Sequence, residues 1–119
     1  MSALLVTAPE LPSKEAMQAL IQRELETCGP KIREAVAPLL IDLLPKILKW
    51  EYGKSEPFPA WVFADMGQRD VYAAYCLGGH GALGSPWGLV FKQDEYFGMD
   101  SGWYRSLREL LLDWGLEDQ

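Results

Sequence analysis

SPWGLVFKQDEYFGMDSGW, residues 85–103, is the stretch that decides the fold of this chain. Residues 86–92 and 96–100 are rich in aromatic and apolar side chains and are separated by a short acidic turn at 93–95, which predicts a hairpin of two antiparallel strands. The stretch places aromatic rings beside carboxylates and contains no recognisable catalytic arrangement. Because such a surface suits a basic partner, the sequence predicts binding rather than chemistry.

A second hairpin is predicted upstream of the first. Residues 61–66 and 71–77 have strand character and are separated by a turn at 67–69. Together the two hairpins predict a four-stranded antiparallel sheet over residues 61–100, followed by a C-terminal helix over residues 101–115. Residues 71–77 are apolar on both faces, so either helices cover both faces of the sheet or one face is kept for a partner.

The first half of the chain predicts a helical hairpin over residues 13–52. Ser13 can cap the first helix, and Gly29-Pro30 ends it. From residue 32 to residue 48, apolar side chains recur three and four positions apart and stay in phase through Pro38 and Pro45. This pattern predicts one bent helix or nearly coaxial pieces, with a kink or restart at each proline.

Length and charge limit the class of protein and of partner. A chain of 119 residues, 49% of them apolar, fits a single α+β domain over residues 1–119, with residues 1–12 as a tail. The net charge of −6 argues against nucleic acid and anionic membrane as partners, because both bind to basic surfaces. Proline and charged residues interrupt the richest apolar run, so it cannot span a bilayer. We therefore expect a cytoplasmic protein.

Cys28 and Cys76 match no metal-binding spacing, and we expect both to be buried thiols. Residues 79–84, GHGALG, match the letters of a dinucleotide-binding motif. That motif requires a helix N-terminus, whereas here the chain continues into a predicted strand, so a flexible loop is expected. His80, the single histidine, is then expected to be exposed; contact with a partner, catalysis and metal binding are its alternatives. The sequence predicts no catalytic residue, cofactor or metal.

Acidic residues concentrate in the second half of the chain. Residues 61–119 carry nine Asp and Glu against four Lys and Arg. Glu109 and Asp113 are four positions apart, so on a helix they share one face and repel each other mildly, which a cationic partner would relieve. The alternative is an ordinary solvated surface, with the aromatic rings in the core. The predicted partner-binding residues are Asp94, Glu95, Asp100, Trp103, Tyr104, Glu109 and Asp113.

The runs WGLVF at 87–91 and GMDSGWY at 98–104 resemble small bacterial immunity proteins, which protect cells from polymorphic or contact-delivered toxins. The resemblance covers roughly residues 60–115. It implies tight binding to a cognate toxin, often a basic nuclease, whose active site is blocked; it assigns no individual contact residue. Two other functions stay open: a small-ligand binder or enzyme built on the glycine loop around His80, and a homodimeric adaptor or structural protein.

Overall fold

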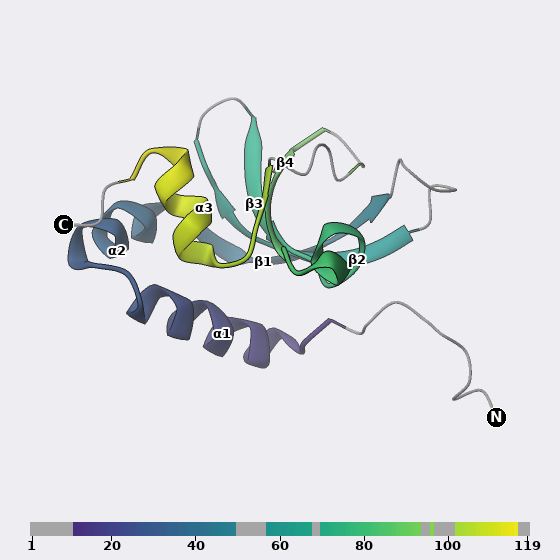
Figure 1. Ribbon diagram of the computed structural model, residues 1–119, viewed down its shortest axis with the longest axis horizontal. Coiled ribbons are helices and arrows are strands. Elements are labelled where there is room, and N and C mark those ends of the chain that lie inside the picture. The colour runs from purple at the N-terminus through teal and green to yellow at the C-terminus, as the bar shows by residue number, and fades with distance from the viewer. Residues whose placement is uncertain (1–10, 50–56, 68–69, 94–95, 97–101, 117–119) are drawn as a thin grey trace.

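The computed structural model describes residues 11–49, 57–67, 70–93, 96 and 102–116. Within these ranges the chain forms an antiparallel β-sheet with helices packed on one side of it (Figure 1). The fold is therefore α+β, as the sequence predicts. The elements in chain order are α1 (Lys14–Glu26), α2 (Pro30–Val36), the 3₁₀-helix η2 (Ala37–Leu39), β1 (Leu40–Lys49), β2 (Pro57–Asp65), β3 (Val71–Tyr75), the 3₁₀-helix η3 (Gly79–Leu83), β4 (Trp87–Phe91), β5 (Trp103–Tyr104) and α3 (Leu107–Trp114).

The first helix forms where its sequence pattern predicts it. The Ser13 hydroxyl accepts a hydrogen bond from the Ala16 amide at 3.1 Å, which caps the helix N-terminus. Met17, Ile21 and Leu25 lie on one stripe of α1 and are buried against the sheet. The stripe fixes which face of the helix meets the core.

The predicted second helix is corrected by the structure, which ends α2 at Val36 and continues as strand β1 over Leu40–Lys49. The helical hairpin over residues 13–52 is thus not confirmed. Pro45 explains the difference, because a proline inside a helix costs about 3 kcal/mol, whereas an edge strand tolerates one. β1 lies at the edge of the sheet and pairs only with β2 among the named strands.

The sheet has five strands in the order β1-β2-β3-β4-β5, one more than predicted. Each strand pairs antiparallel with the next along the chain. The strand paired with β4 is β5 (Trp103–Tyr104), and the C-terminal helix begins later than residue 101, at Leu107. Of the predicted strand 96–100, only Tyr96 lies within the described residues, where it forms an isolated bridge to Lys49.

The two faces of the sheet are buried by different means. On one face, the three α-helices and the sheet enclose a core whose largest fully buried side chain is Phe63. The other face holds a second cluster that includes Val62, Ala74 and Trp103. The sheet also curls (Figure 1), and the Lys46 ammonium of β1 donates to the carbonyl oxygen of Lys92, the residue after β4, at 3.5 Å although β1 and β4 are not neighbours. Within the described residues, the α-helices therefore cover one face, and the 3₁₀-helix η3 packs on the other through His80.

Candidate functional site

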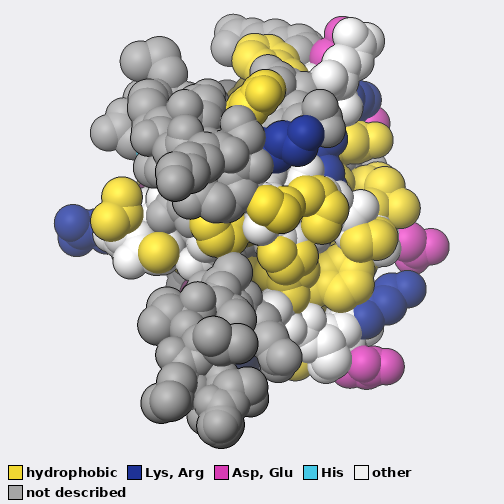
Figure 2. Space-filling model, turned by 90° about the vertical axis from the view of Figure 1, so that its right-hand side faces the viewer, with side chains coloured by type: hydrophobic (Ala, Val, Ile, Leu, Met, Phe, Trp, Pro, Cys, Tyr) yellow, Lys and Arg dark blue, Asp and Glu magenta, His cyan; other side chains and the backbone are white. Residues whose placement is uncertain are grey.

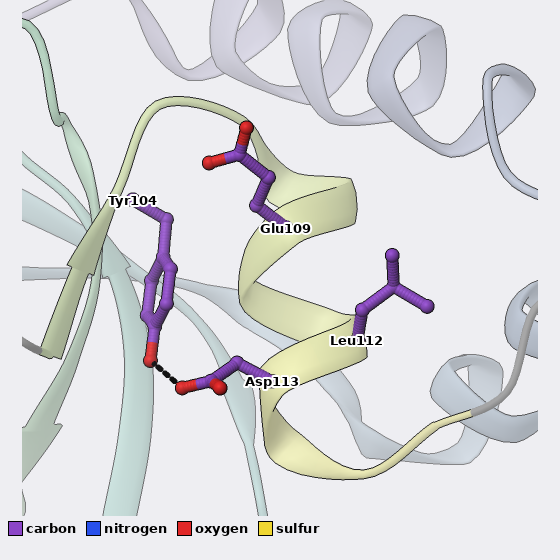
Figure 3. A pocket seen from close by; sticks show the side chains of 4 residues that line it. All are labelled: Tyr104, Glu109, Leu112 and Asp113. Carbon is purple, nitrogen blue, oxygen red and sulfur yellow. Dashed lines mark hydrogen bonds between the residues drawn. The ribbon is translucent and has the colours of Figure 1, made fainter.

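Three of the predicted partner-binding residues meet on one surface. Tyr104, Glu109 and Asp113 line an open hollow of about 640 Å³, and Leu112 supplies an apolar part of its wall (Figure 3). We call these four residues the α3 surface. Asp94, Glu95 and Asp100, which were predicted to belong to the same contact, lie outside the described residues.

Helix α3 positions the two carboxylates. Ser106 caps it by accepting from the Glu109 amide at 3.1 Å, and Gly115 ends it in the left-handed conformation at φ 113°. Leu107, Leu110 and Leu111 are fully buried against the sheet. Because the buried leucines fix the rotation of the helix, Glu109 and Asp113 are exposed on its outer side.

Strand β5 positions the phenol. Tyr104 pairs with Trp87 across β4 and β5, and Trp87 pairs in turn with Tyr75, so the three rings follow one row on the helical side of the sheet. Trp87 also meets Phe63 edge to face at 5.6 Å between ring centroids. Tyr104 is thus the outer end of a packed aromatic row rather than an isolated surface side chain.

The Tyr104 hydroxyl donates a hydrogen bond to the Asp113 carboxylate (Figure 3). Burial and this hydrogen bond together raise the pKa of Tyr104 to about 12, from an ordinary value of 10.0. The phenol is therefore protonated at neutral pH and keeps Asp113 oriented at the edge of the hollow. Glu109 lies one turn earlier on α3 and leaves the hollow acidic on its helical side.

The net charge of the chain is carried by residues outside the described ranges. The sequence has 17 acidic and 11 basic residues, and the ranges that are not described hold eight acidic and two basic ones. The described residues are consequently balanced, with nine of each sign. Arg105 and Arg108 precede Glu109 in the sequence, so the acidity of the α3 surface is local to the hollow.

Trp103 lies away from the α3 surface. It is the neighbour of Tyr104 in β5, and side chains alternate between faces along a strand, so its ring packs in the second cluster and is 5% exposed. The ring covers Gly88, where a Cβ would lie 2.4 Å from it. Trp103 therefore contributes to the core on the face opposite Tyr104.

The prediction that His80 is exposed is wrong, since its side chain is 5% exposed. The glycine-rich segment forms the 3₁₀-helix η3 instead of an open loop, and it turns the His80 ring toward Trp103, with 5.9 Å between ring centroids. Among the residues that the structure describes, no three His, Cys, Asp or Glu side chains gather as a metal site would require. The position of His80 is that of a packed core residue.

Two further features were missed at the sequence level. The first is an ion pair: the Lys92 ammonium lies 2.8 Å from the Asp65 carboxylate, which lowers the pKa of Asp65 and raises that of Lys92.

The second is a patch of apolar side chains at the end of the molecule where β1 ends and β2 begins (Figure 2). At this end the exposed apolar residues that share one face of the two strands are Pro45, Ile47, Pro57 and Pro59, which we call the β1–β2 patch. Assigning residues 40–49 to a helix concealed this patch.

Comparison of the chain with protein-family models, with curated proteins and with solved structures found no match. In the described part of the chain, every helix is too short or too polar to cross a membrane.

Proposed function

We propose that this protein binds and neutralises a cognate toxin domain of basic character, as immunity proteins do, and that the α3 surface is the described part of its contact. The observation that carries the proposal is the convergence of Tyr104, Glu109 and Asp113 on one open hollow. These residues come from β5 and α3, and both elements are held by the core. A rigid, locally acidic surface of this kind suits recognition of a basic protein.

The chemistry of the surface matches Lys and Arg side chains. Glu109 and Asp113 offer carboxylate oxygens to an ammonium or guanidinium group, and such charge-assisted bonds are shorter and stronger than neutral ones. The Tyr104 ring adds an aromatic face, and Leu112 adds apolar contact beside the charges. A nuclease uses Lys and Arg to hold phosphate, so carboxylates that pair with those groups would block its active site.

The test is rescue of growth when a toxin domain is co-expressed with its proposed inhibitor. The probe is a candidate toxin domain, to be sought as the variable C-terminal domain of a large secreted protein if the gene directly upstream encodes one. We expect the wild-type chain to restore growth, and the double variant Glu109→Lys/Asp113→Lys to bind about 10- to 100-fold more weakly and to fail. Glu34→Lys, a charge reversal at an exposed site on α2, is the control and should rescue. Rescue by the double variant at wild-type level would exclude the α3 surface.

A homodimeric adaptor is the second candidate, and the β1–β2 patch favours it. Ile47 is 52% exposed, and its register partner Pro59 in β2 is also exposed. A two-fold interface places the same patch against itself, and apolar side chains complement their own copies. Light scattering over a range of concentrations tests this candidate, which expects the wild-type chain to form a dimer. Ile47→Lys should abolish that dimer. Phe91→Lys, at a 58% exposed site on β4, is the control and should not. A wild-type chain that stays monomeric at high concentration would rule the dimer out.

A further inference from the structure

Glu24 lies where α1 ends and where α3 begins. Its backbone carbonyl oxygen accepts hydrogen bonds from the Thr27 amide at 3.1 Å and from the Thr27 hydroxyl at 2.6 Å, which closes the last turn of α1. Its side-chain Oε1 accepts from the Leu107 amide at 3.0 Å. One residue thus joins two helices that are far apart in the sequence.

The contact to Leu107 supplies something that α3 lacks by itself. The first amides of a helix have no partner within it, and they form the positive end of the helix dipole. Ser106 satisfies the Glu109 amide, and Glu24 satisfies the Leu107 amide with a carboxylate oxygen. The start of α3 is therefore held by one local acceptor and by one acceptor from α1.

The other end of α3 is held by the sheet. Asp113 accepts from the Tyr104 hydroxyl, and six residues of helix, about 9 Å, separate it from Leu107. Glu109 and Leu112 lie between the two attachments and line the hollow. Because a short helix moves as a rigid body, a shift at Leu107 also displaces Asp113 relative to Tyr104.

We propose that Glu24 is a positioning residue for the α3 surface: its side-chain oxygen fixes the start of α3 and thereby holds Asp113 against Tyr104 and Glu109 at the hollow. Its effect on binding rests on the proposed function, whereas the positioning itself is a property of the free protein. The negative charge also favours this end of the helix, but the position of α3 depends on the reach of the side chain, since the contact is a hydrogen bond from a backbone amide to a half-buried side chain.

Two variants of Glu24 separate reach from charge. Glu24→Gln keeps an oxygen at the same distance and removes the charge, whereas Glu24→Asp keeps the charge and shortens the side chain by one methylene. Far-UV circular dichroism checks that each is folded, and the same pair of changes at exposed Glu26 is the control. Amide hydrogen exchange at Leu107 and site-resolved NMR titration of the tyrosine rings are the readouts.

We expect Leu107 to exchange about tenfold faster in Glu24→Asp, with the Tyr104 pKa falling from about 12 toward 10.0, and neither to change in Glu24→Gln. Tyr75 provides an internal check, because burial and then the Glu24 charge raise its pKa, so its pKa should fall in Glu24→Gln. Wild-type exchange and titration in Glu24→Asp would overturn the proposal. If both change as expected and Glu24→Asp still rescues growth fully, positioning stands and the proposed binding surface fails.

Discussion

Gly88 and Trp103 face each other across β4 and β5, and the absence of a side chain on Gly88 is what lets the indole ring lie on the strand. A Cβ at residue 88 would approach the ring carbons of Trp103 to 2.4 Å. The same ring also meets His80 and belongs to the second cluster, so this contact affects packing on the face of the sheet opposite the three α-helices.

Gly88→Ala is expected to destabilise the fold by about 1–3 kcal/mol, because the added methyl group overpacks a buried site. Urea denaturation followed by circular dichroism measures the change. Gly102→Ala is the control, since a Cβ there would lie 3.6 Å from the Leu89 carbonyl oxygen, an ordinary contact distance. Equal unfolding midpoints for the two variants would show that the Trp103 ring moves aside without cost.

Phe63→Ala should lower the free energy of unfolding by about 3–5 kcal/mol, the usual range for removing a buried ring. Phe63 is 1% exposed and packs edge to face on Trp87. Phe91→Ala, at a site that is 58% exposed, should change it by less than about 0.5 kcal/mol. If Phe63→Ala leaves the free energy of unfolding nearly unchanged, Phe63 is not a central residue of the core between the α-helices and the sheet.

Stability should fall as the pH rises from 10 to 12, in part through Tyr104. Its pKa is raised from 10.0 to about 12 in the folded state, so the unfolded chain loses this proton first and ionisation favours unfolding across that window. Below pH 10 both states are protonated and the contribution does not vary with pH. Tyr104→Phe should show a shallower decline when unfolding free energy is measured against pH. Parallel curves for the variant and the wild type would contradict the assignment.

Cys76 should resist thiol reagents until the protein unfolds. It is fully buried, its Sγ donates to the Pro59 carbonyl oxygen at 3.3 Å, and burial raises its pKa to about 11, so little thiolate exists near neutral pH. A Cys28→Ala variant leaves this one thiol to be followed with a chromogenic disulfide at pH 8, with and without urea. Rapid stoichiometric reaction without urea would mean that the second cluster opens readily.

Sequence periodicity located α1 and α3 because helical spacing is a local property. The Glu109–Asp113 pair follows from a separation of four residues, and the structure brings both to the same hollow. Periodicity was misleading for residues 40–49, because the spacing of the apolar residues there is compatible with a helix and with a strand. The decisive factor there was the cost of Pro45 inside a helix, compared with its tolerance at the edge of a sheet.

Trp103 and Tyr104 show why the site was only partly predictable. A helix expected from residue 101 places both on a helical surface, whereas strand β5 sends adjacent side chains to opposite faces. Buried Cys28 and Cys76, in contrast, are confirmed. The Glu24–Leu107 contact depends on how α1 and α3 cross, and no local pattern contains that information.

The strand order β1-β2-β3-β4-β5 bears on how the chain is built during synthesis. Every strand pairs with its predecessor, so the sheet can extend one hairpin at a time as the polypeptide emerges. The helical-side core behaves differently, because Leu107, Leu110 and Leu111 complete it from the other end of the chain against Met17 and Ile21. A nascent chain stopped before residue 107 would therefore carry a nearly finished sheet whose apolar helical side stays open to chaperones and to other unfinished chains.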